Sequence, residues 1–471
     1  MVAIPLASQS DPERREVVSP ERLVNLYPIA SSNPNARAKF YLNRTPGLSV
    51  ATRLSSDLCR GLFNADTEGL ALYGSTLYRI NSSLGPTSIG TISGTGDVRW
   101  SQNNAASRET AIVTGTTAYQ YVAGGALSVI SDNDLPANPI DTICFNGYTL
   151  MFYENGRVYY SAINDANNYD AASFFTVPGI GPLRCAMLVG DRFVVWRSES
   201  MYFYRHVPDD AEDPFQLLSG ADSAFGCINT FANTKVSDYY CFVDQEGMPR
   251  IIGQGGKPSP IGNDGVVADV RDLLDKSEIR CWGYVSGDRA FLVVRSSEFC
   301  WVYDFKEQRW HERISYQRVT WQAKHHMRFA NKDLVAPDQA GGLFYIDDAT
   351  YYEDDQPIVW EFTTPPVTNF PGGGTIWGLD FDIETGTALG ATAAASDQEP
   401  KFTVYLSVNA GKTYGTGRQL SLGTRGQWRK RLSITRCGSF GREGFVIRAS
   451  GSGATPNAIM NLDGKIDPAT A

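Results

Sequence analysis

Along most of the chain, apolar and polar residues alternate in short runs, and the runs come in pairs joined by a turn. Seven such pairs occur between residues 69 and 346, with turns at Gly74, Gly115, Gly156, Ser198, Gly247, Ser297 and Gly341. Successive turns are 41 to 50 residues apart. Alternation gives each strand one apolar face, so every hairpin needs a second sheet to cover it. A strand-built period of about 40 to 50 residues predicts a β-propeller with four-stranded blades.

Between the hairpins lie weaker strand candidates that would complete each blade, for example residues 97–100, 126–130 and 142–145. Six or seven blades both fit this spacing. Two unrelated antiparallel sheet domains would also contain hairpins, because hairpins are common in every all-β chain. One short segment, residues 267–275, has the apolar spacing of a helix.

Both ends of the chain lie outside the repeat. The front has two short apolar runs and a turn-forming Thr45–Pro46–Gly47–Leu48. The rear has an acidic stretch followed by a proline- and glycine-rich stretch, and then strand candidates at 377–383, 402–408, 418–422, 427–435 and 444–449. An isolated hairpin is marginal in water, and a five-stranded sheet leaves exposed edges. We therefore expect the two ends to pack together.

The predicted fold is all-β: a six- or seven-bladed β-propeller with an additional β-sandwich-like domain built from the two chain ends. The predicted divisions are an N-terminal segment that packs with the C-terminal domain (1–55), a propeller (56–350), a linker (351–375) and a C-terminal β domain (376–471). Acidic residues at 347–348 and 353–355 would then lie in or near the linker, where water solvates them.

The net charge of −9 argues against a protein that coats nucleic acid, because such proteins carry a basic surface excess. No run of about 18 apolar residues predicts a membrane span, and the N-terminus does not read as a signal peptide. The eight cysteines have no close pairing, so a disulfide framework is not expected. We expect synthesis in the cytoplasm.

Several motifs suggest chemistry only weakly. Residues 407–414 approximate the Asp-box of sialidase-type propellers, which stabilises a turn and is not catalytic. The adjacent His325 and His326 would point to opposite faces of a strand, whereas a metal needs converging ligands. Glycine-rich pieces at 253–256 and 371–374 lack the context of a phosphate loop. We predict no catalytic residue, cofactor or metal.

The densest basic stretch is the one candidate contact site, formed by Arg425, Trp428, Arg429, Lys430, Arg431 and Arg436. In a strand, Arg429 and Arg431 would share one face, and Trp428 and Lys430 the other. Such a surface fits an acidic partner, another subunit or DNA. A solvated sheet face is an equally good interpretation.

Both ends carry motifs of a known family. These are N-L-Y at 25–27, T-P-G-L at 45–48, S-V-N-A-G-K-T-Y at 407–414, R-Q-L-S-L-G-T-R-G-Q-W-R-K-R at 418–431 and T-R-C-G-S-F-G-R at 435–442. In these motifs, and in having a propeller between them, the chain resembles the packaged-DNA stabilisation proteins of short-tailed phages, also called tail hub or nozzle proteins.

The resemblance implies a structural virion component, made in the host cytoplasm, and not an enzyme. It implies a ring, usually of six copies, below the portal-adaptor ring, which continues the DNA channel and meets a tail plug or needle and fibres or spikes. DNA would pass through without sequence-specific binding. An acidic channel wall would suit that passage, because phosphates find few contacts on it. The alternative is a stand-alone carbohydrate-binding or sialidase-like propeller.

Overall fold

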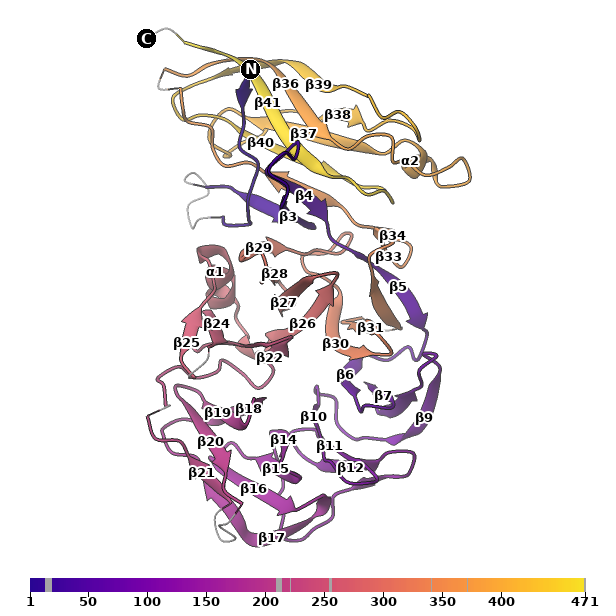
Figure 1. Cartoon of the computed structure of the whole chain (residues 1–471), viewed down its shortest axis with the longest axis vertical. Helices are drawn as coiled ribbons and strands as arrows, with labels where there is room; N and C mark the ends of the chain where they lie inside the picture. The colour runs from indigo at the N-terminus through magenta and orange to yellow at the C-terminus, as the bar shows by residue number, and fades with distance from the viewer. Residues whose placement is uncertain are drawn as a thin grey trace.

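The computed structural model describes residues 1–12, 19–208, 214–220, 222–253, 256–339, 341–370 and 372–469. Gln254, Gly255 and Pro371, which belong to the two glycine-rich pieces, lie outside the described residues. The described chain is almost entirely strands, as the alternating pattern predicts. A propeller forms one body and a sandwich stacks against it, with both termini at the sandwich end (Figure 1).

In the described residues the propeller has seven four-stranded blades, each made of consecutive antiparallel strands except the last. Blade one consists of β6 (Cys59–Asn64), β7 (Gly69–Tyr73), β8 (Thr76–Ile80) and β9 (Pro86–Thr91). Blade two consists of β10 (Arg99–Gln102), β11 (Glu109–Val113), β12 (Ala118–Val122) and β13 (Leu127–Val129). Blade three consists of β14 (Asp141–Phe145), β15 (Tyr148–Phe152), β16 (Arg157–Ala162) and β17 (Asp165–Thr176). The next two are β18 (Leu183–Val189), β19 (Arg192–Arg197), β20 (Met201–His206), β21 (Phe215–Leu217); and β22 (Asn233–Val236), β23 (Tyr239–Val243), β24 (Pro249–Ile252), β25 (Pro258–Pro260).

Blades six and seven complete the ring, and blade seven takes its fourth strand from another part of the chain. They are β26 (Arg280–Ser286), β27 (Arg289–Arg295), β28 (Cys300–Asp304), β29 (Arg309–Glu312); and β30 (Ala323–Phe329), β31 (Lys332–Pro337), β32 (Leu343–Asp347), β5 (Gly47–Thr52). The outermost strand of blade seven therefore comes from the N-terminal segment, where Tyr345 pairs with Ser49. This strand closes the ring of blades.

The seven turns predicted from the repeat are confirmed, because each joins the second and third strands of one blade. Apolar clusters fill the spaces between neighbouring blades. Blades three and four, for instance, share Ile143, Phe145, Phe193 and Phe215, and the Phe145 and Phe193 rings meet edge to face at 5.2 Å. The propeller core therefore consists of apolar clusters between neighbouring blades.

The sandwich is built from both ends of the chain, as predicted. Its first sheet has the order β3 (Leu26–Ala30), β4 (Phe40–Arg44), β41 (Ile459–Pro468), β36 (Gly374–Ile383), β39 (Leu432–Phe440), with β1 (Val2–Ala3) also paired to β41. Its second sheet has the order β2 (Arg22–Val24), β35 (Trp360–Thr363), β40 (Val446–Gly451), β37 (Lys401–Ser407), β38 (Arg418–Ser421). The core between them joins Ile4 and Leu23 from the front to Phe362 and Phe402 from the rear.

One sheet runs through both bodies. Blade six continues from β29 into β2, which is parallel to β29 and antiparallel to β35, giving nine strands in all. The predicted linker, 351–375, needs correction, because β35 and a small hairpin of β33 (Tyr352–Glu353) and β34 (Gln356–Pro357) lie within it. Glu353 is buried and not solvated, since it pairs with propeller residues.

The helices are short. Those in the described part of the chain are α1 (Asp264–Asp272), η1 (Lys276–Glu278) and α2 (Ala395–Gln398). The helix predicted over 267–275 begins earlier, because Asn263 caps it by accepting a hydrogen bond from the Val266 amide, and it ends before Leu274, which is 96% exposed. Within the described chain, no helix has the length and apolarity needed to cross a membrane.

Candidate functional site

The predicted contact residues lie mostly on one loop of the sandwich. We call residues 422–431, between β38 and β39, the Trp428 loop. The strand expected over 427–435 begins only at Leu432, so the alternation of faces predicted for Trp428 to Arg431 is wrong. Gly423 and Gly426 both have φ of 89°, a conformation that ends an extended strand and that glycine adopts without strain.

Backbone hydrogen bonds hold the loop at its base. The Gly426 amide donates to the Gly386 carbonyl (3.0 Å), and the Gly386 amide donates to the Leu422 carbonyl (3.3 Å). Leu422 is buried in the sandwich core, and Lys430 donates to Ser421 Oγ (2.7 Å). The loop is therefore anchored at both ends.

The anchored loop presents a large aromatic side chain to solvent. Trp428 is 65% exposed. Its ring lies over Gly386, where a Cβ atom would come within 3.0 Å of the ring. Arg425 and Arg429 beside it are also exposed. Exposed tryptophan and arginine are the residue types that most often dominate protein–protein contacts.

A groove of about 730 Å³ runs beside the loop between β36, β39 and β41. Four acids and four bases line it: Asp380, Asp382, Glu384 and Asp463, and Arg37, Arg429, Lys430 and Arg431. Arg431 pairs with Asp380 (3.2 Å) and Arg37 with Asp382 (2.6 Å). The basic run is thus balanced by acids from neighbouring strands, which sequence spacing could not reveal. A balanced groove suits a protein surface better than phosphates.

Arg436 lies further along, in β39. It has φ of 56°, and the β36–β39 pairing shifts register at this point. β39 is an edge strand of its sheet, and the Arg436 side chain is exposed. The structure therefore places this residue on the same sheet but outside the Trp428 loop.

A second constellation, which the sequence did not single out as a site, locks the sandwich to the propeller. Asn25 is 1% exposed. Its Nδ2 donates to the carbonyls of Ile314 (2.8 Å) and Val359 (2.7 Å), and its Oδ1 accepts from the Ile314 amide (3.1 Å). Ile314 follows β29 in the propeller and Val359 precedes β35 in the sandwich. One side chain from the N-L-Y motif therefore joins both bodies.

Charged groups reinforce this junction. Arg22 donates to both Glu312 oxygens, at 2.8 Å from Nε and 2.5 Å from Nη2. Arg313 is fully buried, lies 3.5 Å over the Trp321 ring and donates to the carbonyl of Pro46, in the T-P-G-L motif. Burial raises the pKa of Glu353, which Arg313 and Ser315 oppose by stabilising the charged form. Both front motifs thus serve the junction.

The other motifs have structural roles. In the Asp-box-like segment, the Gly411 amide donates to Ser407 Oγ (2.9 Å) and the Thr413 amide to Asn409 Oδ1 (3.0 Å), so it stabilises a turn. His325 and His326 contact different carboxylates, as expected for neighbours on a strand. Across the residues with assigned positions, no three His, Cys, Asp or Glu side chains gather as metal ligands.

Comparison with solved structures finds matches at low sequence identity. They include the WD40 propeller domain of Doa1 (10% identity, TM-score 0.42, 64% of this chain and 97% of that chain) and virginiamycin B lyase from Staphylococcus aureus (11%, 0.45, 64% and 99%). YCF48 bound to D1 peptide is similar at 14% identity and TM-score 0.43, over 64% of this chain and 98% of that chain. No curated protein matches the chain significantly in sequence.

Family models give a much more specific result. Residues 4–351 match the model described as "Bacteriophage P22 Gp10, beta-propeller", and residues 359–467 match "Bacteriophage P22 Gp10, beta-sandwich". The unmatched stretch between them, 352–358, holds the small hairpin of β33 and β34. The first match covers the propeller and also β2, β3 and β4 of the sandwich, and the second covers the rest of the sandwich. The chain therefore belongs to the family of bacteriophage P22 Gp10, the tail hub or nozzle proteins of short-tailed phages.

Proposed function

We propose that the chain is the hub, or nozzle, of a phage tail. Six copies form a ring below the portal and its adaptor, continue the DNA channel, retain packaged DNA and release it on ejection. The ring also meets the tail plug or needle and the fibres or spikes. The observation that carries this proposal is the family match across both bodies, residues 4–351 and 359–467, since this family consists of structural phage tail proteins.

The Trp428 loop and its groove form a contact surface between neighbouring copies in this ring. The loop is anchored, so little conformational freedom is lost on binding. The groove carries equal numbers of acids and bases, so it complements a mixed protein surface. Arg425, Arg429 and Arg436 extend the same surface at its rim.

The overall charge supports a channel wall that DNA slides past. With 42 basic and 51 acidic residues, the chain has a net charge of −9. Phosphate contacts supply most of the non-specific affinity for DNA, so an acidic wall leaves DNA free to move. A stand-alone sialidase-like or carbohydrate-binding propeller is the weaker alternative, because the Asp-box-like turn lies between β37 and β38 of the sandwich and not in a blade. We propose no enzymatic activity.

Assembly tests this function. The purified chain, alone and mixed with a portal-adaptor complex, is measured by light scattering coupled to size exclusion and by electron microscopy. We expect a six-copy ring that binds below the adaptor. A chain that stays monomeric and does not bind the complex would contradict the proposal.

Substitution of Trp428 tests whether this surface forms the contact between neighbouring copies. Trp428→Ala should leave the melting temperature within about 2 °C, because the side chain is mostly exposed, and should prevent ring formation. Trp377→Ala is the matched control, since Trp377 is 55% exposed on the same sandwich but does not line the groove. A Trp428→Ala chain that assembles like the wild type would place the interface elsewhere.

A further inference from the structure

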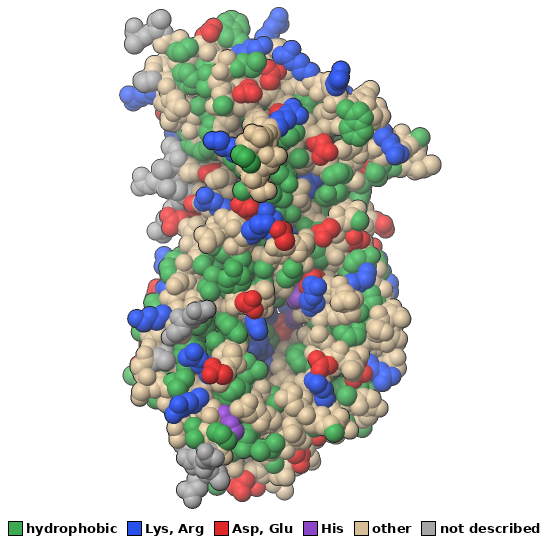
Figure 2. Space-filling model, in the orientation of Figure 1, with side chains coloured by type: hydrophobic (Ala, Val, Ile, Leu, Met, Phe, Trp, Pro, Cys, Tyr) green, Lys and Arg blue, Asp and Glu red, His purple; other side chains and the backbone are tan. Residues whose placement is uncertain are grey.

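The centre of the propeller holds a small cavity that the assembly role does not use. Its volume is about 250 Å³. It is lined from the innermost strands of blades one, two, six and seven, with Gly61, Arg99, Arg280 and Lys324 as examples, and from Phe231 just before blade five. Figure 2 shows charged side chains at the hollow in the centre of the propeller. Lining from so many blades places the cavity on the propeller axis.

The cavity is basic, although the protein is acidic. Two carboxylates hold its cations: Asp97 accepts from Arg280 Nε and from Lys324 Nζ, both at 2.8 Å, and Asp141 accepts from Arg99 Nε at 2.7 Å. Three cations against two carboxylates leave one positive charge in excess. Burial lowers the pKa of the neighbouring His325, so this imidazole stays neutral and does not change the count at neutral pH.

The two carboxylates are buried, whereas the cationic side chains are partly exposed to the cavity. The Asp97 side chain is 5% exposed and that of Asp141 is 0% exposed. By contrast, Arg99 and Lys324 are 21% and 26% exposed. An incoming ligand therefore meets positive groups that are already fixed in place by buried carboxylates. A concave site with one sign of charge concentrates its field on a ligand of opposite sign.

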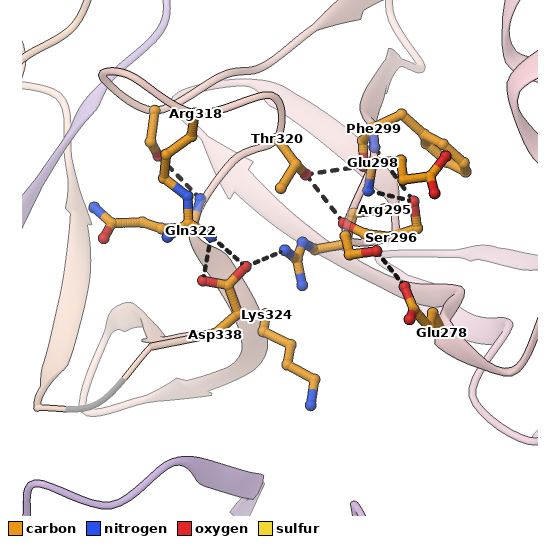
Figure 3. A network of polar contacts seen from close by, with 12 residues as sticks. Glu278, Arg295, Ser296, Glu298, Phe299, Arg318, Thr320, Gln322, Lys324 and Asp338 are labelled. Atoms are coloured by element: carbon orange, nitrogen blue, oxygen red, sulfur yellow. Dashed lines mark hydrogen bonds and ion pairs between the residues drawn. The ribbon is translucent and has the colours of Figure 1, made fainter. Parts of the chain in front are cut away.

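Hydrogen-bond donors remain available there. The Lys324 ammonium has three N–H groups and uses one for Asp97. Arg99 uses Nε and Nη2 for Asp141, and among the residues with described positions no acceptor is recorded for its Nη1. Nearer the loops, Arg295 and Arg318 both bind Asp338 at 2.7 Å, and Lys324 extends away from that network (Figure 3). Lys324 therefore takes no part in the Asp338 ion pairs, and its charged partner is Asp97.

We propose that the axial cavity binds one small oxyanion, a phosphate or carboxylate group, held by Lys324 and Arg99 beside the Phe231 ring. Fixed arginine and lysine donors form the strongest hydrogen bonds to such groups. The volume is below the roughly 300 to 1,000 Å³ of sites for drug-sized ligands, so the ligand is a small solute and not a polymer segment.

Calorimetric titration of the full-length chain with sodium phosphate, and separately with sodium succinate, tests this at constant ionic strength. We expect saturable binding of one ligand per chain with at least one of the two probes, and the probe that binds identifies the class of oxyanion. Lys324→Gln should weaken that binding roughly tenfold or more, because it removes a charge-assisted hydrogen bond.

Two further variants separate binding from folding. Lys324→Arg keeps the charge and should retain binding within a few fold. Lys401→Gln, an exposed site on the sandwich, should change nothing. Asp97 keeps Arg280 as a partner in the Lys324 variants, so thermal melting should show folded protein. If neither probe binds saturably, or if Lys324→Gln binds as tightly as the wild type, the site does not exist. The result is independent of ring assembly.

Discussion

The structure gives two reasons for an asparagine at Asn25, the first position of the N-L-Y motif. Its φ is 53°, a left-handed conformation that asparagine tolerates better than most side chains. The same residue satisfies polar backbone groups of the propeller and the sandwich at once. Backbone geometry and hydrogen bonding therefore both select this residue type.

Asn25→Ala should lower the free energy of unfolding by about 3 kcal/mol, because buried groups of Ile314 and Val359 lose their partner. Denaturant titration measures this loss. Asn35→Ala, at an exposed position of the same segment, is the control and should change stability little. Equal stability of both variants would contradict the role of Asn25 at the junction.

His311 is a buried imidazole in β29. Its ring lies 5.7 Å from the Tyr27 ring and 6.1 Å from the Phe291 ring, and neither nitrogen has a hydrogen-bond partner in the described structure. Burial, with a smaller contribution from Arg313, lowers the pKa of His311 to about 3. The unfolded chain binds a proton near pH 6.5, whereas the folded chain does not until about pH 3.

This difference predicts that stability falls as pH drops from about 6.5 towards 3, with His311 contributing up to about 1.4 kcal/mol per pH unit. His311→Phe should remove that contribution, since phenylalanine does not titrate and suits the aromatic neighbours. Stability of both proteins is measured by denaturant titration at several pH values. An unchanged pH dependence would show that His311 does not carry it.

The sequence predicted the inner hairpins well and the outer parts less well. Strands such as β7 and β19 have buried residues at nearly every position, so their apolar pattern is strong. β41 was missed, because its sequence IMNLDGKIDP mixes polar residues and glycine, although it lies in the middle of its sheet. Residues 427–431 of the Trp428 loop were predicted as the start of a strand, whereas that strand begins only at Leu432.

The candidate contact surface around Trp428 could be predicted only in part from the sequence, because residues from distant strands complete it. Residue types such as Trp428 beside arginines suggested a contact surface. The acids that balance them come from β36 and β41, about 35 to 50 residues away in either direction, and only the sheet order brings them together. Likewise, the axial cavity gathers residues from four innermost strands, and no local pattern marks it.

The strand β5 is what closes the propeller. Removing residues 1–50 should therefore unfold more than the segment itself, because blade seven loses most of its outer strand and the sandwich loses β1, β2, β3 and β4. We expect a large loss of thermal stability by circular dichroism and no ring assembly. Adding residues 1–55 back as a separate peptide should restore part of the stability. A truncated chain with normal melting and assembly would refute this.

At the level of the whole molecule, the nine-stranded sheet contains strands of both the propeller and the sandwich, so we expect the two to unfold as one cooperative unit. We expect a single unfolding transition by calorimetry, since β2 pairs with β29 on one side and β35 on the other. Glu312→Ala removes the partner of Arg22 and should move that one transition to lower temperature. Glu298→Ala, at an exposed position, is the control. Two separate transitions in the wild type would disprove the coupling.

Because the last blade uses an N-terminal strand, β5 is synthesised long before β32, the strand with which it pairs. Asp347 of β32 pairs with Gly47 of β5, and the two are 300 residues apart (347 − 47). At about 5 to 20 residues per second, β5 is made roughly 15 to 60 s before its partner strand leaves the ribosome. Throughout that interval its edge is unpaired. We therefore expect that, for neighbouring copies synthesised on one message, exchange of β5 between copies competes with closure of each copy on itself.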